Sequence, residues 1–90
     1  MFIDYDPDKR ATTLVQRGVD MARAGEVFAG PTLTVEDDRF DYGEARFITI
    51  GCLDERMVVL VWTSRSDARR IISMRKANER EQKAYSPRLR

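Results

Sequence analysis

The sequence predicts an α+β fold in which helices pack on an antiparallel sheet, in the order β-α-α-β-β-β-β-α. Three observations lead to this prediction. Apolar residues in the first third of the chain recur at helical spacing after one short strand. From Pro31 onward the pattern becomes that of successive strands joined by short polar links. Asn78 with Glu81 three positions later is typical of the start of a last helix.

The N-terminal part predicts a strand over 2–5 and two helices. Asp6-Pro7 is typical of a helix start, because a carboxylate accepts a free N–H and proline needs no partner there. The spacing places three apolar residues on one face of this helix: Ala11, Leu14 and Val15. Gly18 ends it. Asp20 caps the second helix, which Gly30-Pro31 ends and whose apolar stripe is Met21, Ala24, Val27 and Phe28.

Four further strands are expected over 32–36, 45–51, 57–63 and 69–75. The third of these is apolar nearly throughout, which suits a central strand covered on both faces. Short links favour an antiparallel meander. The acidic run Glu36-Asp37-Asp38 is expected to be a solvated turn. The last helix ends at Ser86-Pro87, and we expect residues 86–90 to form a frayed tail.

Composition restricts the class of protein. Ninety residues predict a single domain over 1–90. No apolar run approaches the roughly 20 residues that span a bilayer, and the N-terminus has no signal-peptide pattern. Cys52 is the single cysteine and histidine is absent, so we expect no disulfide, no metal site and no cofactor. These features favour a cytoplasmic protein that does not contact membranes.

Charge is divided unevenly along the chain. Residues 1–64 carry 7 basic and 12 acidic groups, a net of −5, and residues 65–90 carry 9 basic and 3 acidic groups, a net of +6. The sum is the net charge of +1. Such asymmetry favours contact with nucleic acid or an acidic partner. It is also compatible with a solvated basic face or with charge pairing inside the fold.

Several residue strings resemble the BrnT family of toxins. They are Asp6-Pro7-Asp8-Lys9, Gly18-Val19 with Glu26-Val27-Phe28, Gly43-Glu44-Ala45-Arg46 with Ile50-Gly51, and the run from Arg70 to Ala77 with Arg80-Glu81 and Tyr85. The resemblance implies a RelE-like toxin that cleaves RNA. It also implies a ribbon-helix-helix antitoxin as partner, which would carry the complex to its operator DNA and repress the operon.

The chain departs from the usual family pattern just before Gly18. The family shows Asn and then Lys-His there, and these positions hold Thr13, Gln16 and Arg17. Arginine cannot replace histidine as a proton carrier, because guanidinium stays protonated, but it can hold a phosphate. A second hypothesis is therefore a catalytically degenerate toxin that binds its antitoxin as a co-repressor. A third hypothesis is an unrelated RNA-binding module. The sequence contains no RNP-like aromatic pattern or GXXG loop that would support it.

Cleavage of RNA through its 2′-hydroxyl needs a base, an acid and positive groups around phosphorus. Without histidine, Glu44 is the natural base. The candidate catalytic residues are Glu44, Arg46, Arg65, Arg75 and Lys9, and the candidate phosphate-binding residues are Arg17, Arg69, Arg70 and Lys76. The meander brings Glu44, Arg46, Arg65, Arg69 and Arg70 to one end of the sheet, and Arg75 lies nearer the other end. The alternatives to these catalytic roles are structural. Glu44 and Arg46 would form only a surface ion pair, and Arg75 would form an internal salt bridge.

Strand alternation makes a further prediction about the last strand. Arg69, Ile71, Ser73 and Arg75 are expected on one face, which looks open to a ligand, and Arg70, Ile72, Met74 and Lys76 on the other. Trp62 is expected in the core.

Overall fold

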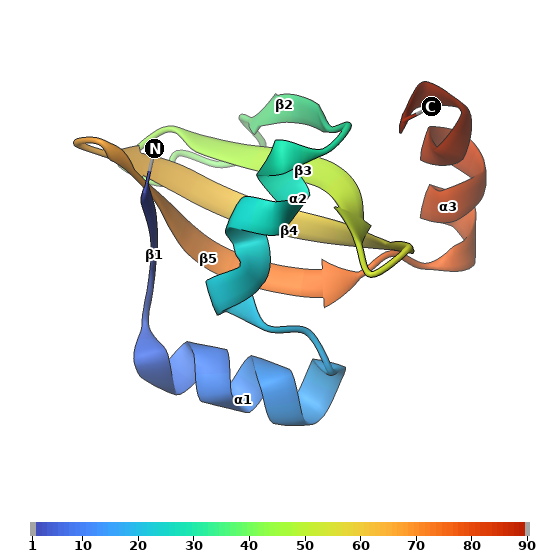
Figure 1. The fold of residues 1–90 in the computed structure, drawn as a ribbon. Coiled ribbons are helices and arrows are strands. Elements are labelled where there is room, and N and C mark those ends of the chain that lie inside the picture. Colours follow the sequence, from blue (N-terminus) through green and yellow to red (C-terminus); the bar gives the residue numbers. More distant parts are fainter. Residues whose placement is uncertain (1, 90) are drawn as a thin grey trace.

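The computed structural model describes residues 2–89 and contains a five-stranded sheet in the order β1-β5-β4-β3-β2 (Figure 1). The strands are β1 (Phe2–Tyr5), β2 (Leu33–Asp37), β3 (Arg46–Leu53), β4 (Arg56–Arg65) and β5 (Ala68–Lys76). The α-helices are α1 (Pro7–Arg17), α2 (Ala24–Ala29) and α3 (Glu79–Tyr85). Two 3-10 helices, η1 (Met21–Arg23) and η2 (Ser86–Leu89), precede α2 and follow α3. The predicted α+β class is confirmed.

The sheet is mixed, which corrects the prediction of a wholly antiparallel one. Strands β2 to β5 form the predicted antiparallel meander, whereas β1 pairs with β5 in parallel, with Phe2 opposite Ala68 and Tyr5 opposite Ile71. The meander leaves one edge of β5 unpaired, and β1 covers the first half of that edge. Local patterning predicts strands but carries no signal for this pairing between the two ends of the chain.

The predicted helix ends are confirmed. The Asp6 carboxylate accepts the Asp8 N–H at 2.8 Å, and Gly18 closes α1 in the left-handed conformation at φ 69°. Asp20 accepts the Ala22 N–H at 2.9 Å, although the first turn after it is the 3-10 helix η1 rather than α-helix. Asn78 and Glu81 form a complete capping box at α3.

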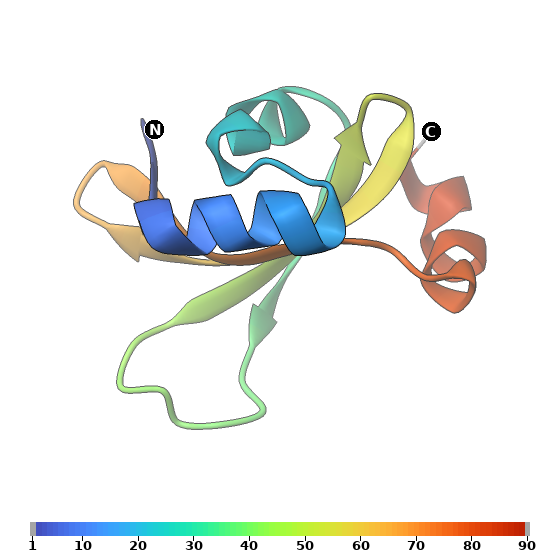
Figure 2. The same ribbon diagram turned by 90° about the horizontal axis from the view of Figure 1, so that it is seen from below.

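The larger core lies between one face of the sheet and the segment η1–α2. Met21, Ala24 and Val27 from this segment pack on Leu60 and Met74 from the sheet, and all five are essentially inaccessible to solvent. Trp62 is buried in the same core, as predicted, and its Nε1–H donates to Thr49 Oγ1 at 2.8 Å. Figure 2 shows α2 on this side of the sheet, with the loop between β2 and β3 projecting on the other.

The opposite face of the sheet is covered only at one end. There Leu89 and Tyr85 pack on a second, smaller core of Ile50, Met57 and Val59. This contact is also a correction, because Ser86–Leu89 form a 3-10 helix with Leu89 buried, in place of the expected frayed tail. An apolar residue near the chain end can be held by an exposed apolar sheet face, which local sequence does not reveal. The rest of this face, toward Arg46 and Arg70, stays open.

A β-bulge in β5 changes which residues share a face. Val61 pairs with Ser73, and Trp62 pairs with Ile71, so Ile72 is an extra residue without a partner on β4. The alternation therefore shifts at Ile72. Arg69 and Ile71 lie on the same face as Met74 and Lys76, and Arg70 lies on the same face as Ser73 and Arg75. The predicted grouping of these residues by strict alternation is wrong for this reason.

Helix α1 runs along the edge of β5 beyond the end of β1 (Figures 1 and 2). None of its residues is buried, and Val15 is 86% exposed. The apolar face that its spacing predicts is therefore not the face that meets the sheet. A polar stripe of α1 faces β5 instead, and this orientation shapes the site.

Candidate functional site

Five of the nine candidate residues line one cavity at the end of the sheet. The cavity has a volume of about 250 Å³ and lies on the open face, where α1 begins beside β5. Its charged walls are Lys9 from α1, Glu44 from the loop before β3, Arg46 from β3, Arg65 from the end of β4 and Arg70 from β5, with Asp6 at the rim. We refer to it as the basic cavity. The meander predicts this meeting of Glu44 with Arg46, Arg65 and Arg70, and α1 adds Lys9.

Glu44 is the carboxylate that lies beside Arg46 and Arg65 in the basic cavity. Its Oε1 lies 3.4 Å from Nη2 of Arg65, and its Oε2 lies 3.9 Å from Nε of Arg46. Both contacts are long for charged hydrogen bonds, so the carboxylate is held loosely. Nε of Arg46 is buried and has no hydrogen-bond partner among residues 2–89. A buried guanidinium N–H without an acceptor is costly unless a ligand supplies one.

Arg70 is fixed in the cavity by the N-terminal strand. Its Nη1 donates to Asp4 Oδ2 at 3.0 Å, across the parallel pair in which Asp4 and Arg70 are register partners. Sequence reasoning missed Asp4, because the partner of Arg70 depends on the parallel pairing of β1 with β5. The ion pair leaves other N–H groups of the guanidinium available to an anion.

Tyr42 supports Arg46 from the loop between β2 and β3. The Arg46 guanidinium lies over the Tyr42 ring at 4.1 Å from its centroid, and the Tyr42 hydroxyl donates to Asp37 Oδ2 at 3.1 Å. Asp37 is buried and also accepts Nε of Arg39 at 2.8 Å, an ion pair that lowers the pKa of Asp37 to about 2. Asp37 therefore anchors this loop, which corrects its interpretation as part of a solvated turn.

Arg75 lies outside the basic cavity. Its two terminal nitrogens donate to the two carboxylate oxygens of Glu81 at 2.7 and 2.8 Å, which is the internal salt bridge given above as the alternative. This pair holds the pKa of Glu81 at about 2. Arg75 therefore connects β5 to α3, and it lies away from the cations of the basic cavity.

Arg69 and Lys76 lie on the face of the sheet opposite to Arg70, Arg69 by ordinary alternation and Lys76 because of the bulge at Ile72. The Arg69 guanidinium lies over the ring of Phe28 at 4.1 Å and near Trp62, at the margin of the larger core. Lys76 lines a separate depression beside Gly18 and Arg56. Neither side chain reaches the basic cavity, so their grouping with Arg70 is a correction.

Arg17 lies at the far end of a second depression, which α1 forms with β5. We call this depression the α1–β5 groove. It has a volume of about 400 Å³, and its polar lining includes Lys9, Thr12, Thr13, Gln16, Arg17 and Ser73. Lys9 and Ile72 line both this groove and the basic cavity, so the two are contiguous. Sequence reasoning identified Lys9 and Arg17 here and missed the hydroxyl and amide groups.

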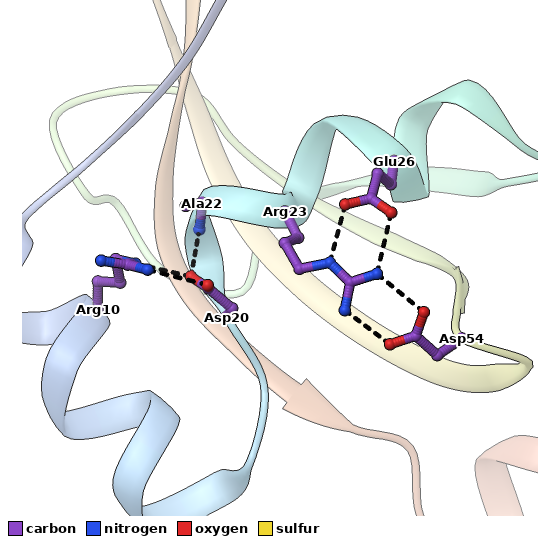
Figure 3. Close-up of polar contacts among 6 residues, drawn as sticks. All are labelled: Arg10, Asp20, Ala22, Arg23, Glu26 and Asp54. Atoms are coloured by element: carbon purple, nitrogen blue, oxygen red, sulfur yellow. Dashed lines mark hydrogen bonds and ion pairs between the residues drawn. The ribbon is translucent and has the colours of Figure 1, made fainter.

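Two sets of ion pairs hold the helical segment that carries this groove (Figure 3). Arg10 of α1 donates to both carboxylate oxygens of Asp20 at 2.7 and 3.0 Å, which attaches α1 to the start of η1. Arg23 forms bidentate pairs with Glu26 and with Asp54, which joins η1–α2 to the turn between β3 and β4. Arg10 lowers the pKa of Asp20, and Arg23 lowers the pKa of Asp54.

This arrangement defines a class of protein: a small α+β protein in which two carboxylates, Glu44 and Asp6, and four cations line a cavity at an open sheet end. Such a site is suited to a phosphodiester, because guanidinium groups bind phosphate and a carboxylate can accept a proton. The profile of the family described as "Ribonuclease toxin, BrnT, of type II toxin-antitoxin system" matches residues 5–81. The chain therefore belongs to the BrnT family of ribonuclease toxins.

The family description implies an antitoxin as partner and RNA as target. The search of curated proteins found no match. Among residues 2–89, no helix is long and apolar enough to cross a membrane.

Proposed function

We propose that this chain is a metal-independent endoribonuclease toxin that cleaves RNA at the basic cavity. The observation that carries the proposal is the meeting of Glu44 with Lys9, Arg46, Arg65 and Arg70 in one cavity. The family membership supports it independently. Metal independence is favoured by the donor set, because the chain has no histidine and residues 2–89 contain no cluster of three metal-ligating side chains.

The reaction that suits these residues is transfer of the phosphodiester to its own 2′-oxygen. The Glu44 carboxylate takes the proton of the 2′-hydroxyl, the bond from O2′ to phosphorus forms, and the bond from phosphorus to O5′ breaks. The Lys9 ammonium supplies the proton to the leaving O5′. Arg46, Arg65 and Arg70 neutralise the charge that develops on the phosphate oxygens, and the buried Nε–H of Arg46 finds its acceptor there.

The decisive experiment is cleavage of a defined RNA by the purified protein in EDTA, together with growth after induced expression. We expect cleavage and growth arrest from the wild type. Glu44→Gln and Arg46→Ala should each lower the cleavage rate by about a hundredfold, the usual effect of losing a proton-transfer group or a charge stabiliser. Glu36→Gln is a matched carboxylate control on β2. Cleavage that survives Glu44→Gln would contradict the assigned base.

We further propose that the fold is RelE-like and that the partner of this chain is a ribbon-helix-helix antitoxin. The complex of the chain with this antitoxin binds operator DNA and represses the operon. Membership of a type II toxin family supports the pairing. Co-expression with the product of the neighbouring gene should restore growth and yield a complex that shifts the operator fragment. The chain alone should leave the same fragment unshifted.

A catalytically degenerate toxin that acts as an antitoxin-binding co-repressor is the second candidate. The absence of histidine favours it, because the family histidine position holds Arg17. The two candidates differ in one result. A degenerate toxin binds the antitoxin but neither cleaves RNA nor arrests growth, whereas the ribonuclease does all three.

A further inference from the structure

We propose that the α1–β5 groove is a nucleobase subsite, in which Thr12, Thr13, Gln16 and Ser73 read one base next to the phosphate that is cleaved. The inference rests on the proposed ribonuclease function. It adds a binding site for a specific base, and therefore a sequence preference, to a reaction that the basic cavity alone would perform on any RNA.

The α1–β5 groove lies next to the basic cavity. The groove and the basic cavity share Lys9 and Ile72 in their walls, and Ser73 follows Ile72 on the open face. A nucleotide whose phosphate lies among Lys9, Arg46 and Arg70 therefore has its base within reach of the groove. The volume of about 400 Å³ falls in the range of small-molecule sites.

The walls of the groove carry the polar groups that a base needs. Hydroxyl groups of Thr13 and Ser73 and the amide of Gln16 each supply both a donor and an acceptor, which is what the hydrogen-bonding edge of a base requires. No side-chain hydrogen bond within residues 2–89 occupies these groups, whereas Arg17 reaches Met74 O at 3.5 Å. Met21 supplies an apolar wall beneath them.

Helix α1 is oriented with polar residues toward the groove. Lys9, Thr13, Gln16 and Arg17 are spaced i, i+4, i+7 and i+8, so they share one helical face. That face is turned to β5, while Val15 is left 86% exposed. A helix docked for stability would turn its apolar residues inward. The docking of α1 is fixed instead by the ion pair of Arg10 with Asp20.

Binding of mononucleotides tests the subsite without relying on catalysis. Inorganic phosphate and the four nucleoside 3′-monophosphates are each titrated into the wild type, and amide chemical shifts are followed by NMR. Phosphate alone should move resonances around Arg46 and Arg70. One of the four nucleotides should in addition move Thr12 to Arg17 and Ser73 and bind more tightly than the other three. Nucleotides that move only the resonances moved by phosphate would overturn the proposal.

Mapping of cut sites in a randomised RNA tests the same residues in the reaction. The wild type should favour one base beside the cut. Thr13→Val and Gln16→Leu should each lower the ratio of cleavage at that base to cleavage at other bases by about tenfold, the usual value of one or two base-edge hydrogen bonds. Val15→Ser, on the exposed side of the same helix, should leave the ratio unchanged.

The two proposals fail in different ways. If Glu44→Gln leaves cleavage intact, the assigned chemistry is wrong, and the nucleotide titration still decides the groove. If Glu44→Gln lowers the cleavage rate as expected and the base preference is the same in Gln16→Leu and wild type, the basic cavity stands and the nucleobase subsite does not.

Discussion

Glu81 accepts hydrogen bonds from two elements at once. Its Oε1 accepts the Asn78 N–H at 2.9 Å to complete the capping box of α3, and the same carboxylate receives both terminal nitrogens of Arg75 from β5. The capping box follows from the spacing of Asn78 and Glu81, and the pair with Arg75 does not. The spacing of Asn78 and Glu81 therefore predicted the start of α3. It did not reveal that Glu81 also connects this helix to β5 through Arg75.

The stability contribution of Glu81 should depend on pH. Its pKa falls from an ordinary 4.5 to about 2 on folding, chiefly because of the hydrogen bonds from Arg75. A lowered folded-state pKa stabilises the protein above the unfolded pKa, and this contribution is lost as pH falls toward the folded value. We expect Glu81→Gln to lower the free energy of unfolding by about 1–2 kcal/mol near neutral pH, a figure reduced for the partial exposure of Arg75.

Urea unfolding of wild type and Glu81→Gln across a pH series measures this difference. The gap between the two proteins should narrow steadily as pH drops below about 4.5 toward 2. Glu79→Gln, in the same first turn of α3 and exposed, is the control. A gap that stays constant over the whole acid range would show that the ion pair does not carry the effect.

For some helices and strands the local sequence pattern predicts which face is buried and how the element pairs, and for others it does not. Strand β4 is apolar nearly throughout and is central, as the pattern predicts. The apolar spacing of Leu14 and Val15 predicts an inward face that α1 does not have, because Arg10 and Asp20 hold the helix in another orientation. The bulge at Ile72 likewise follows from pairing with β4 and has no signature in β5 itself.

Val15→Ser should have almost no effect on stability. The side chain is 86% exposed, so little apolar surface returns to water on unfolding. We expect a change within about 0.5 kcal/mol, as for most surface substitutions. Chemical denaturation of the two proteins checks this. A loss of about 2 kcal/mol or more would mean that the apolar face of α1 is buried in solution.

Asp20→Asn should loosen α1 relative to the rest of the chain. The substitution weakens the bidentate pair with Arg10 but keeps an oxygen that can cap η1. Because α1 buries no residue, we expect its amides to exchange faster with solvent while amides of β4 keep their protection. Hydrogen exchange followed by NMR makes the comparison. Equal acceleration in α1 and β4 would indicate global destabilisation instead.

At the scale of the whole molecule, part of the uneven charge of the sequence is paired inside the fold. Arg70 pairs with Asp4 and Arg65 lies beside Glu44, while Arg75 pairs with Glu81 within the C-terminal third. The acidic N-terminal part thus neutralises part of the basic C-terminal third through Arg65 and Arg70. The class of fold and the meeting of residues at one sheet end could be predicted from the meander. The placement of Ser73 and Arg75 on the same face as Arg70 could not, since it depends on the bulge.

The placement of cations predicts the salt dependence of RNA binding. For single strands, the logarithm of affinity falls with the logarithm of salt by about 0.7 per phosphate contact. With Glu44→Gln as a background that cleaves about a hundredfold more slowly, Arg70→Ala should reduce this slope by about 0.7, the value of one phosphate contact. Lys76→Ala, on the opposite face, should leave it unchanged. Equal losses for both variants would mean that RNA is held by diffuse charge on both faces.

The extra residue in β5 also bears on how the family can vary in length. Without Ile72, the strand would keep Arg69, Ile71 and Met74 on one face and Arg70 and Ser73 on the other by ordinary alternation, so a one-residue deletion there preserves the pairing with β4. A deletion far from Ile72 would instead move the residues between it and the bulge to the opposite face. The Ile72 side chain also lines both the basic cavity and the α1–β5 groove. A chain shorter by this one residue would therefore keep its sheet and lose a wall that the two depressions share.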